Sequence, residues 1–302
     1  MKNAVVPILN PFEMGKIHFD AKLAWQTLFT PTHHYFHINR LEEYKDMMNF
    51  PLPPHRKMVF DFVFLTNGTS VRSKGLDHYE FGANTFFFLP AYQITTHKSM
   101  SAEAKGYYCH FDSELLTKNF QARELLEEYS FLHFLGNPLV TIDAETTQTI
   151  LFILRRLEKE YKKNEKVDFG IVQGYLLALL AEIKPFVKTE RKVKINAASQ
   201  ITEKYKSALA QYSYEKQKIR DYADILSVTP NHLNKCVKAT TGKSAHELLD
   251  DMLLLEAKVM LKQTGLSIAE IAFRIGKNDL SDFGRFFKQK TGFTPGEYRK
   301  YE

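Results

Sequence analysis

The pattern of apolar and polar positions changes character near Asp112. Between residues 31 and 112, short runs rich in aromatic and β-branched residues alternate with turn residues, as in "KMVFDFVFLTNGTSV". Such runs are typical of β-strands, and the Asn67-Gly68 pair in this stretch favours a hairpin. Two further runs, "HYEFGANTFFFLPAY" and "EAKGYYCHFD", repeat the pattern. Several short strands at this spacing predict a β-sandwich or a small barrel.

After Asp112 the apolar residues recur at helical spacing. Residues 113–132 predict a helix of uncertain end, and residues 143–164 predict a firmer helix that Asp143 caps. A further helix covers residues 168–186 and ends or kinks at Pro185. The apolar residues on one face of the helix over 143–164 are Ile150, Leu151, Leu154 and Leu157.

The two helices over 143–164 and 168–186 carry more apolar surface than one face of a small domain needs. They either cover each other or form the seam of a homodimer. Residues 188–200 are charged and indicate a linker, and the pattern beyond them is helical. We therefore predict a multidomain chain, β-rich first and all-α afterwards. The three expected regions are 1–142, 143–200 and 201–302.

The last hundred residues contain an internal repeat with a period near fifty. "DYADILSVTPNHLNKCVKATTG" aligns with "EIAFRIGKNDLSDFGRFFKQKTG", and each copy predicts a helix, a tight turn and a second helix. A one-residue insertion falls in the turn, where it is most easily absorbed. The aligned positions are Ala223 with Ala272 and Leu226 with Ile275 at an offset of 49, then Leu233 with Phe283 and Thr241-Gly242 with Thr291-Gly292 at an offset of 50.

Capping signals support two helix-turn-helix units, at about 218–242 and 267–292. In the second unit Ser267 and Glu270 form a capping box, Gly276 ends the first helix and Asp279 caps the next. In the first unit Thr229 caps the second helix, and Pro230 occupies its first position. Four residues of the second unit's later helix are expected to point inward, namely Leu280, Phe283, Phe286 and Phe287.

A third helix is predicted between the two units. Ser244 and Glu247 form its capping box, and Gly265 is a good stop signal. About 20 residues give a length of ~30 Å, close to the ~34 Å of one turn of DNA. A spacer of this length could place two recognition helices in successive major grooves.

Charge supports DNA as the target, because the excess of positive charge is confined to one part of the chain. Residues 191–302 contain 20 Lys and Arg against 13 Asp and Glu, a net charge of +7, whereas the remainder has 21 against 22, a net charge of −1. Asn, Arg, Lys and Ser side chains on the second helix of each copy are suited to contact base edges and phosphates. The structural alternative is a solvated basic surface on ordinary packed helices.

The motifs "SIAEIAFRIG", "FFKQKTGFTPGEYRK" and "VTPNHLNKCVKATTGKS" closely resemble the AraC/XylS family of bacterial transcription regulators. The resemblance is specific over about 215–300 and weaker over 31–112. It implies a cupin-like β-barrel that senses a small molecule, a helical dimerisation region and two helix-turn-helix units that bind double-stranded DNA. RNA polymerase is a further possible partner. The candidate DNA-contacting residues are Thr229, Asn231, His232, Asn234, Lys235, Lys238, Lys277, Asn278, Ser281, Asp282, Arg285, Lys288 and Gln289.

Three positions depart from the pattern of the resembled family. Lys277 stands in the turn where an aromatic residue is usual, and the matching residue of the first copy is Val228. Asp282 replaces a frequent Tyr, and Met252 replaces a frequent Arg. Lys277 either reaches a phosphate from the turn or leaves the second unit the looser of the two.

The N-terminal region offers candidate effector-binding residues. Strand alternation places Phe60, Phe62 and Phe64 on one face, where they could line or fill a pocket. The remaining candidates are Phe86 and Phe88, with Arg56, Arg72 and Tyr92 as polar groups. The effector itself cannot be read from the sequence, so a regulator controlled by a protein partner is the alternative.

A metal-dependent cupin enzyme is the rival class. His33, His34 and His37 lack the His-x-His spacing of such a site, so we expect neither metal, cofactor nor catalysis. With no run of eighteen apolar residues and no secretory signal, we expect no membrane span. The two cysteines, Cys109 and Cys236, are consistent with a reducing cytoplasm.

Overall fold

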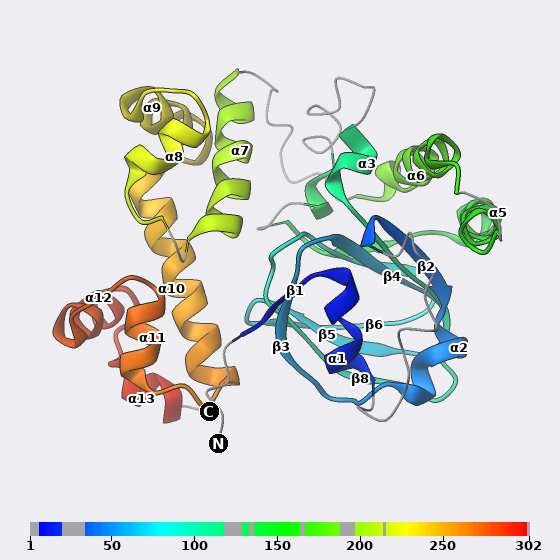
Figure 1. Cartoon of the computed structure of the whole chain (residues 1–302), viewed down its shortest axis with the longest axis horizontal. Helices are drawn as coiled ribbons and strands as arrows, with labels where there is room; N and C mark the ends of the chain where they lie inside the picture. The colour runs from blue at the N-terminus through cyan, green and yellow to red at the C-terminus, as the bar shows by residue number, and fades with distance from the viewer. Residues whose placement is uncertain are drawn as a thin grey trace. The chain divides into compact units, whose positions relative to one another are not determined.

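The computed structural model describes residues 6–19, 34–117, 129–132, 136–163, 167–187, 197–213 and 216–300. The chain divides into two compact units, and each is treated by itself. The β unit is Ile8–Glu190, and the helical unit is Met1–Pro7 with Arg191–Glu302. The expected order, β-rich first and all-α afterwards, is confirmed (Figure 1).

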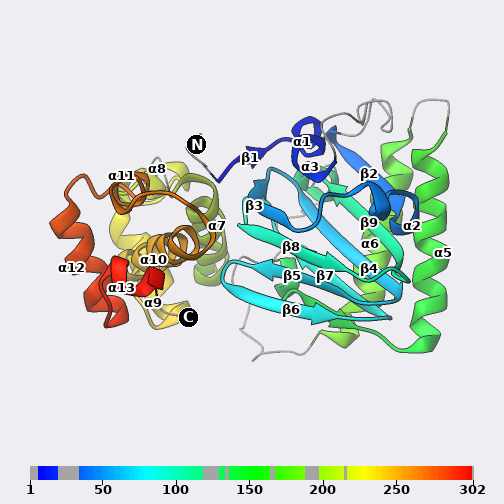
Figure 2. The same cartoon turned by 90° about the horizontal axis from the view of Figure 1, so that it is seen from below.

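The β unit contains two five-stranded sheets that pack face to face (Figure 2). All strand pairs are antiparallel except β1 with β3. The first sheet has the order β1 (Ile8–Leu9), β3 (Leu52–Lys57), β8 (Thr95–Met100), β5 (Ser70–Lys74) and β6 (Asp77–Phe81). The second has the order β10 (Leu139–Thr141), β7 (Thr85–Leu89), β4 (Phe60–Asn67), β9 (Lys105–Phe111) and β2 (Phe36–Arg40).

The hairpin prediction at Asn67-Gly68 is wrong. Strands β4 and β5 lie in different sheets, so this turn carries the chain from one sheet to the other. Gly68 has φ of +76°, and a Cβ built on it would lie 2.5 Å from the Cα of Ala104. The turn at Gly82-Ala83-Asn84 also connects the two sheets, between β6 and β7. The hairpin is instead β5–β6, around Gly75 at φ of +63°.

The second sheet is buried on both faces. Its outer face packs against α5 (Ala144–Tyr161) and α6 (Phe169–Ile183) in one apolar cluster (Figure 2). Its inner face joins the opposite sheet through a smaller cluster. Burial of one such Phe or Leu side chain contributes about 1.5–3 kcal/mol. The outer cluster includes Phe62, Phe64, Phe86, Phe88, Ile150 and Leu179, and the inner one includes Val63, Leu65, Phe81 and Phe87.

Short helices complete the described part of the β unit. They are η1 (Pro11–Glu13), α1 (Gly15–His18), α2 (Leu41–Tyr44), η4 (Lys45–Met47), α3 (Ser113–Thr117), η5 (Ser130–Leu132) and η6 (Lys184–Phe186). The predicted helix over 113–132 is seen as α3 and η5, and residues 118–128 of that prediction lie outside the described residues.

The helices α5 and α6 begin directly after Asp143 and Asp168, the first residues of their predicted ranges, and each ends three residues before the end of its predicted range. The Asp143 side chain accepts a hydrogen bond from the Thr146 backbone N–H at 2.8 Å, and Pro185 follows the end of α6. The structure differs from the expected three regions in one respect. Both helices share a core with the second sheet and belong to the β unit, so they do not form a region of their own.

Within the described residues, the segment Phe169–Phe186 is long and apolar enough to cross a membrane, judged by length and composition alone, with a mean hydropathy of 1.3. In the structure it contains α6, whose Val172, Leu176 and Leu179 are buried in the outer cluster. A core helix of a folded domain has the same composition, so the absence of a membrane span stays a prediction.

The helical unit contains two helix pairs joined by a longer helix (Figure 1). It starts with α7 (Ala197–Tyr212), which begins inside the segment predicted as linker; residues 188–196 of that segment lie outside the described residues. The following helices are α8 (Ile219–Ile225), α9 (Pro230–Thr241), α10 (Ala245–Gln263), α11 (Ile268–Arg274), α12 (Leu280–Thr291) and α13 (Pro295–Lys300).

Candidate nucleic-acid interface and barrel interior

The two helix pairs α8–α9 and α11–α12 repeat the same turn. In each, one residue adopts the left-handed conformation, Ser227 at φ of +54° and Gly276 at φ of +70°. The next residue then donates its backbone N–H to the first helix. Val228 donates to the Ala223 carbonyl at 2.9 Å, and Lys277 donates to the Ala272 carbonyl at 2.8 Å. The repeat read from the sequence is therefore present in the backbone.

The caps of the second helices also match. Thr229 accepts from the His232 N–H at 3.2 Å, and Asp279 accepts from the Ser281 and Asp282 N–H groups. Both helices end at a left-handed glycine, Gly242 or Gly292. Matching starts and ends give α9 and α12 the same length of 12 residues.

The inward residues of α12 are fewer than the sequence predicts. Phe283 and Phe287 are buried, and Phe286 is half-buried. Leu280 is 53% exposed, because it is the first residue of the helix and lies at the turn rather than over the core.

The candidate DNA-contacting residues lie on the surface of the helical unit. All are exposed except Asn234 and Lys277, which are half-buried. Asn234 has a second task, because its Oδ1 accepts from the Ala245 N–H at the start of α10 at 3.0 Å. Thr229 is similarly engaged as a cap. The side chains on the outer faces of α9 and α12 remain available to a ligand.

Two contacts modify the second unit. The Lys277 ammonium lies 4.9 Å from the centre of the Phe286 ring, so a cation–aromatic contact occupies the turn. Arg285 pairs with Asp282 one helical turn earlier, and both side chains are largely exposed. An exposed pair of this kind contributes little to stability and can open when a phosphate or base competes for the arginine.

Helix α10 connects the helix pair α8–α9 to the helix pair α11–α12, as predicted. The Ser244–Glu247 capping box is present, and 19 residues at 1.5 Å give a length of about 28 Å. The helix packs against α9 at one end and against α11 and α13 at the other. Met252, one of the three departures, is buried within this packing and does not reach the surface.

The structure places seven of the eight candidate effector residues away from any described cavity in the β unit. Phe60, Phe62 and Phe64 do share a face, but it is the outer face under α5 and α6, as it is for Phe86 and Phe88. Arg56 is buried and donates to the Tyr92 carbonyl at 2.8 Å, which ties strand β3 to the segment between β7 and β8. Arg72 alone of the eight lines the cavity between the sheets.

That barrel cavity has a volume of about 60 Å³. Apart from Arg72, its polar lining comes from residues that the sequence interpretation did not select as effector-binding. They include Lys57 and His55 on β3, His97 on β8, Tyr108 on β9, His18 on α1 and Lys45 on η4. The alternation of His55 and Lys57 along β3, with Asp61 inside the aromatic run of β4, was the available signal.

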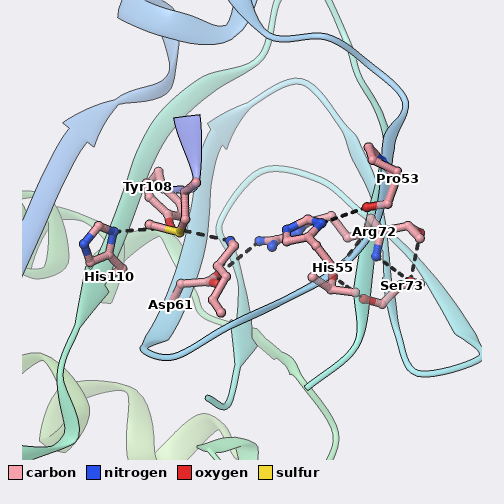
Figure 3. A network of polar contacts seen from close by, with 11 residues as sticks. Pro53, His55, Asp61, Arg72, Ser73, Tyr108 and His110 are labelled. Carbon is pink, nitrogen blue, oxygen red and sulfur yellow. Dashed lines mark hydrogen bonds and ion pairs between the residues drawn. The ribbon is translucent and has the colours of Figure 1, made fainter. Parts of the chain in front are cut away.

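Three buried charges form a network at this cavity. Lys57 Nζ lies 2.8 Å from Asp61 Oδ2, and Arg72 Nη1 lies 3.2 Å from Asp61 Oδ1. Lys57 also donates to the Tyr108 hydroxyl at 3.5 Å. Figure 3 shows this chain of contacts from His110 through Tyr108 and Asp61 to Arg72.

Burial controls the charge states around the network. Burial lowers the pKa of Lys57 to about 8, with Asp61 opposing the shift, so the lysine is still mostly protonated at pH 7. Burial alone would raise the pKa of Asp61, but Lys57 and Arg72 hold it below its usual value. Burial lowers the pKa of His55 to about 3 and the pKa of His97 well below 6.5. Both imidazoles are therefore neutral.

Within the described ranges, no group of three or more His, Cys, Asp or Glu side chains could hold a metal ion. The His37 ring, one of the three histidines weighed above, is buried and hydrogen-bonds to Tyr161 and Asn39. His33 lies outside the described residues.

Comparison with protein families identifies the helical unit. Residues 222–301 match the family model described as a helix-turn-helix domain, and this range spans both helix pairs from Tyr222 onward. Within this range, the helical unit contains a helix-turn-helix domain similar to those of AraC/XylS-type transcription regulators. It therefore carries the DNA-binding domain of a transcription regulator.

Curated relatives that this chain resembles are named as transcription regulators. An uncharacterized HTH-type transcriptional regulator of Bacillus subtilis, YisR, is 24% identical over 257 residues, which cover 80% of this chain and 86% of YisR. The HTH-type transcriptional activator RhaR of Mannheimia succiniciproducens is 28% identical over 52% of this chain and 56% of its own length. The chain thus spans about half of RhaR.

A solved structure of ToxT from Vibrio cholerae with a bound unsaturated fatty acid covers 87% of this chain and 94% of ToxT, at 14% identity and a TM-score of 0.38. A match at this level carries no inference about the barrel or its ligand. The interior of the β unit is therefore interpreted from its own residues.

Proposed function

We propose that this chain is a sequence-specific transcription regulator that reads duplex DNA with α9 and α12 and senses a small effector in its β unit. The observation that carries the proposal is the duplicated helix-turn-helix geometry with polar and cationic side chains on both second helices. Such a protein acts without catalysis and works in the bacterial cytoplasm, where the DNA is.

The dimensions of the helical unit support simultaneous reading of two grooves. The α10 spacer of about 28 Å approaches the ~34 Å that separates successive major grooves on one face of DNA. Asn231, Lys235 and Arg285 carry the donors and acceptors that base edges and phosphates recognise. Of these, Arg285 is the strongest candidate for a base contact, since arginine pairs with guanine through two hydrogen bonds.

The test begins with genome-wide mapping of bound DNA, which supplies the target duplex. Arg285→Ala should then weaken binding to that duplex by about 1–3 kcal/mol in fluorescence anisotropy. Lys235→Ala should instead lower the salt dependence of binding by about one phosphate contact. Lys98→Ala, which removes an exposed lysine on β8 in the β unit, is the matched control and should change neither quantity. Unchanged affinity of the Arg285 variant would remove it from the readers.

We infer that α5 and α6 also join two copies of the chain. Phe152 on α5 is 63% exposed, and a shallow hollow is lined by Arg156 of α5 and by residues of α6 that include the small Gly174 and Ala178. Small residues let a second helix approach closely. Sedimentation of the purified protein tests this: a monomer at micromolar concentration would contradict the dimer. RNA polymerase is the expected further partner of an activator.

One observation favours a second candidate function. The barrel cavity of about 60 Å³ is far smaller than the roughly 300–1,000 Å³ of drug-sized ligand sites. A regulator without a small ligand, controlled by a protein partner, would not need a larger cavity. Titration with the small anions described below separates the two.

A further inference from the structure

The barrel cavity carries more buried positive charge than negative charge. Its two buried cations are Lys57 and Arg72, with side chains 2% and 3% exposed, and Asp61 is the carboxylate that pairs with both. Lys45 also lines the cavity, but it is half-buried and donates to the carbonyls of Ala102 and Ala104. No Asp or Glu stands among the lining residues in the described part of the chain. Two buried cations against one buried anion leave a net charge of +1 in a medium of low dielectric constant. Such a charge is costly unless a further anion compensates it.

Two hydrogen-bonding atoms at the same cavity have no partner among the described residues. They are Arg72 Nε and His55 Nε2. The arginine atom is an N–H donor and requires an acceptor. His55 is neutral, and its Nδ1 lies 2.8 Å from the Pro53 carbonyl oxygen, which can only accept. Nδ1 therefore carries the proton, and Nε2 is left as an acceptor that requires a donor.

These unpaired groups define the chemistry that a ligand of this cavity must have. The ligand must bring a single negative charge, oxygen acceptors for Arg72 and Lys57, and an O–H donor for His55. A dianion such as sulfate would replace an excess of +1 by −1, and it has no O–H donor for His55. The volume of about 60 Å³ corresponds to roughly four or five water molecules, which excludes sugars and larger molecules.

We propose that the barrel cavity binds a small hydroxycarboxylate, with the carboxylate between Lys57 and Arg72 and the hydroxyl donating to His55 Nε2. This ligand would be the effector of the regulator proposed above, and in that respect the inference rests on the proposed function. The methionines beside the cavity, Met14, Met48 and Met100, are flexible side chains that can accommodate the carbon atoms.

The test is isothermal titration of the full-length protein at pH 7 with lactate, propionate, lactamide and sulfate. Propionate lacks the hydroxyl, and lactamide lacks the charge. Lactate should bind at least about tenfold more tightly than either, and sulfate should not compete. Equal affinity for propionate and lactate would overturn the assignment of His55. Binding of sulfate without lactate, or binding of none of the four, would overturn the site.

Variants assign the binding to the named residues. Lys57→Met leaves the Asp61–Arg72 pair balanced, so the protein should fold and lose at least about tenfold in lactate affinity. Lys74→Met is the matched control, since Lys74 is another buried lysine of the same sheet that does not line the cavity and donates to the Gly136 carbonyl. It should retain lactate binding. The melting temperature of each variant establishes folding, and unchanged lactate affinity in Lys57→Met would overturn the proposal.

DNA affinity is measured on the same preparations to keep the two hypotheses apart. If the protein binds its target duplex but no hydroxycarboxylate, this inference fails and the regulator stands. If lactate binds through Lys57 while the protein binds no DNA, the cavity site stands and the proposed function fails.

Discussion

The two units of this protein use the same charged side chains in opposite ways. In the β unit, Asp61 pairs with Lys57 and Arg72, and all three side chains are at most 3% exposed. In the helical unit, Asp282 pairs with Arg285, and the two side chains are 57% and 78% exposed. Water screens the second pair but not the first. Buried charges therefore suit the β unit to the selective ligand site proposed above, whereas exposed charges suit the helical unit to the proposed contact with a polyanion.

The largest expected effect comes from removing a buried partner. Asp61→Asn leaves Lys57 and Arg72 buried without a counter-charge and should destabilise the β unit by about 3–5 kcal/mol. The matched change Asp282→Asn breaks the exposed pair and should alter stability by less than about 1 kcal/mol. Calorimetry measures both, and hydrogen exchange assigns the transition to a unit. Equal losses in the two variants would remove the contrast between the units.

The response to acid should also separate the units. His55 has a pKa of about 3 in the folded chain against about 6.5 when unfolded, so the unfolded state binds the extra proton between these values. The contribution of His55 to the free energy of unfolding is complete above pH 6.5 and is lost as the pH falls toward 3. Asp61, whose pKa is lowered by Lys57 and Arg72, contributes in the same direction.

Calorimetry at pH 7, 5.5 and 4.5 should therefore show the β unit losing stability first. At the alkaline end, Lys57 with a folded pKa of about 8 should make the β unit gain stability between pH 8 and 10.5. The charged and titratable groups facing these residues are Asp61, Arg72, Tyr108, His18 and His97. A helical unit that melts first on acidification would contradict this prediction.

In the helical unit, stability depends on the local backbone. Gly276→Ala should cost about 1–2 kcal/mol because φ is +70° there, and the new Cβ also meets the Gln217 side chain. Gly284→Ala is the same substitution inside α12, where nothing lies within 4 Å of the new Cβ. It should instead stabilise by about 0.5–1 kcal/mol. The melting temperature of the helical unit measures both, and a common sign would refute the backbone explanation.

The smallest expected effect concerns Lys277. Lys277→Met keeps an unbranched side chain over Phe286 and removes the charge, so it should cost about 0.5–1 kcal/mol of stability. Lys277→Phe restores the aromatic residue usual at this turn. Tighter DNA binding with a higher melting temperature would indicate a loose turn, whereas weaker binding would indicate that Lys277 contacts phosphate.

Local signals in the sequence were sufficient for the helical unit. The capping boxes at Ser244 and Ser267, the cap at Asp279 and the left-handed Gly276 all lie where the sequence predicts. Each depends on residues within four positions of one another. The geometry of each cap is set by the backbone of a single turn. The same residue pattern in the two copies therefore predicted the same local structure.

The same reasoning reached only part of the β unit. Strand alternation does place Phe60, Phe62 and Phe64 together, but alternation cannot say which face is inside. In β4 both faces are buried, one by α5 and α6 and the other by the opposite sheet. Likewise, the prediction of a turn at Asn67-Gly68 is correct, but the prediction of a hairpin is wrong. A turn residue specifies a local bend and not the sheet that the next strand joins.

The sequence alone therefore determined the order of the units, the duplicated helix-turn-helix and the polar surface proposed to face DNA, since these follow from local backbone preferences and from the charge of nearby residues. Only the tertiary structure decided which side of β4 meets the cavity. That choice brings Asp61 to Lys57 and Arg72 from three separate strands. Contacts between strands distant in sequence leave no periodic signal, and it is these contacts that create the buried charge.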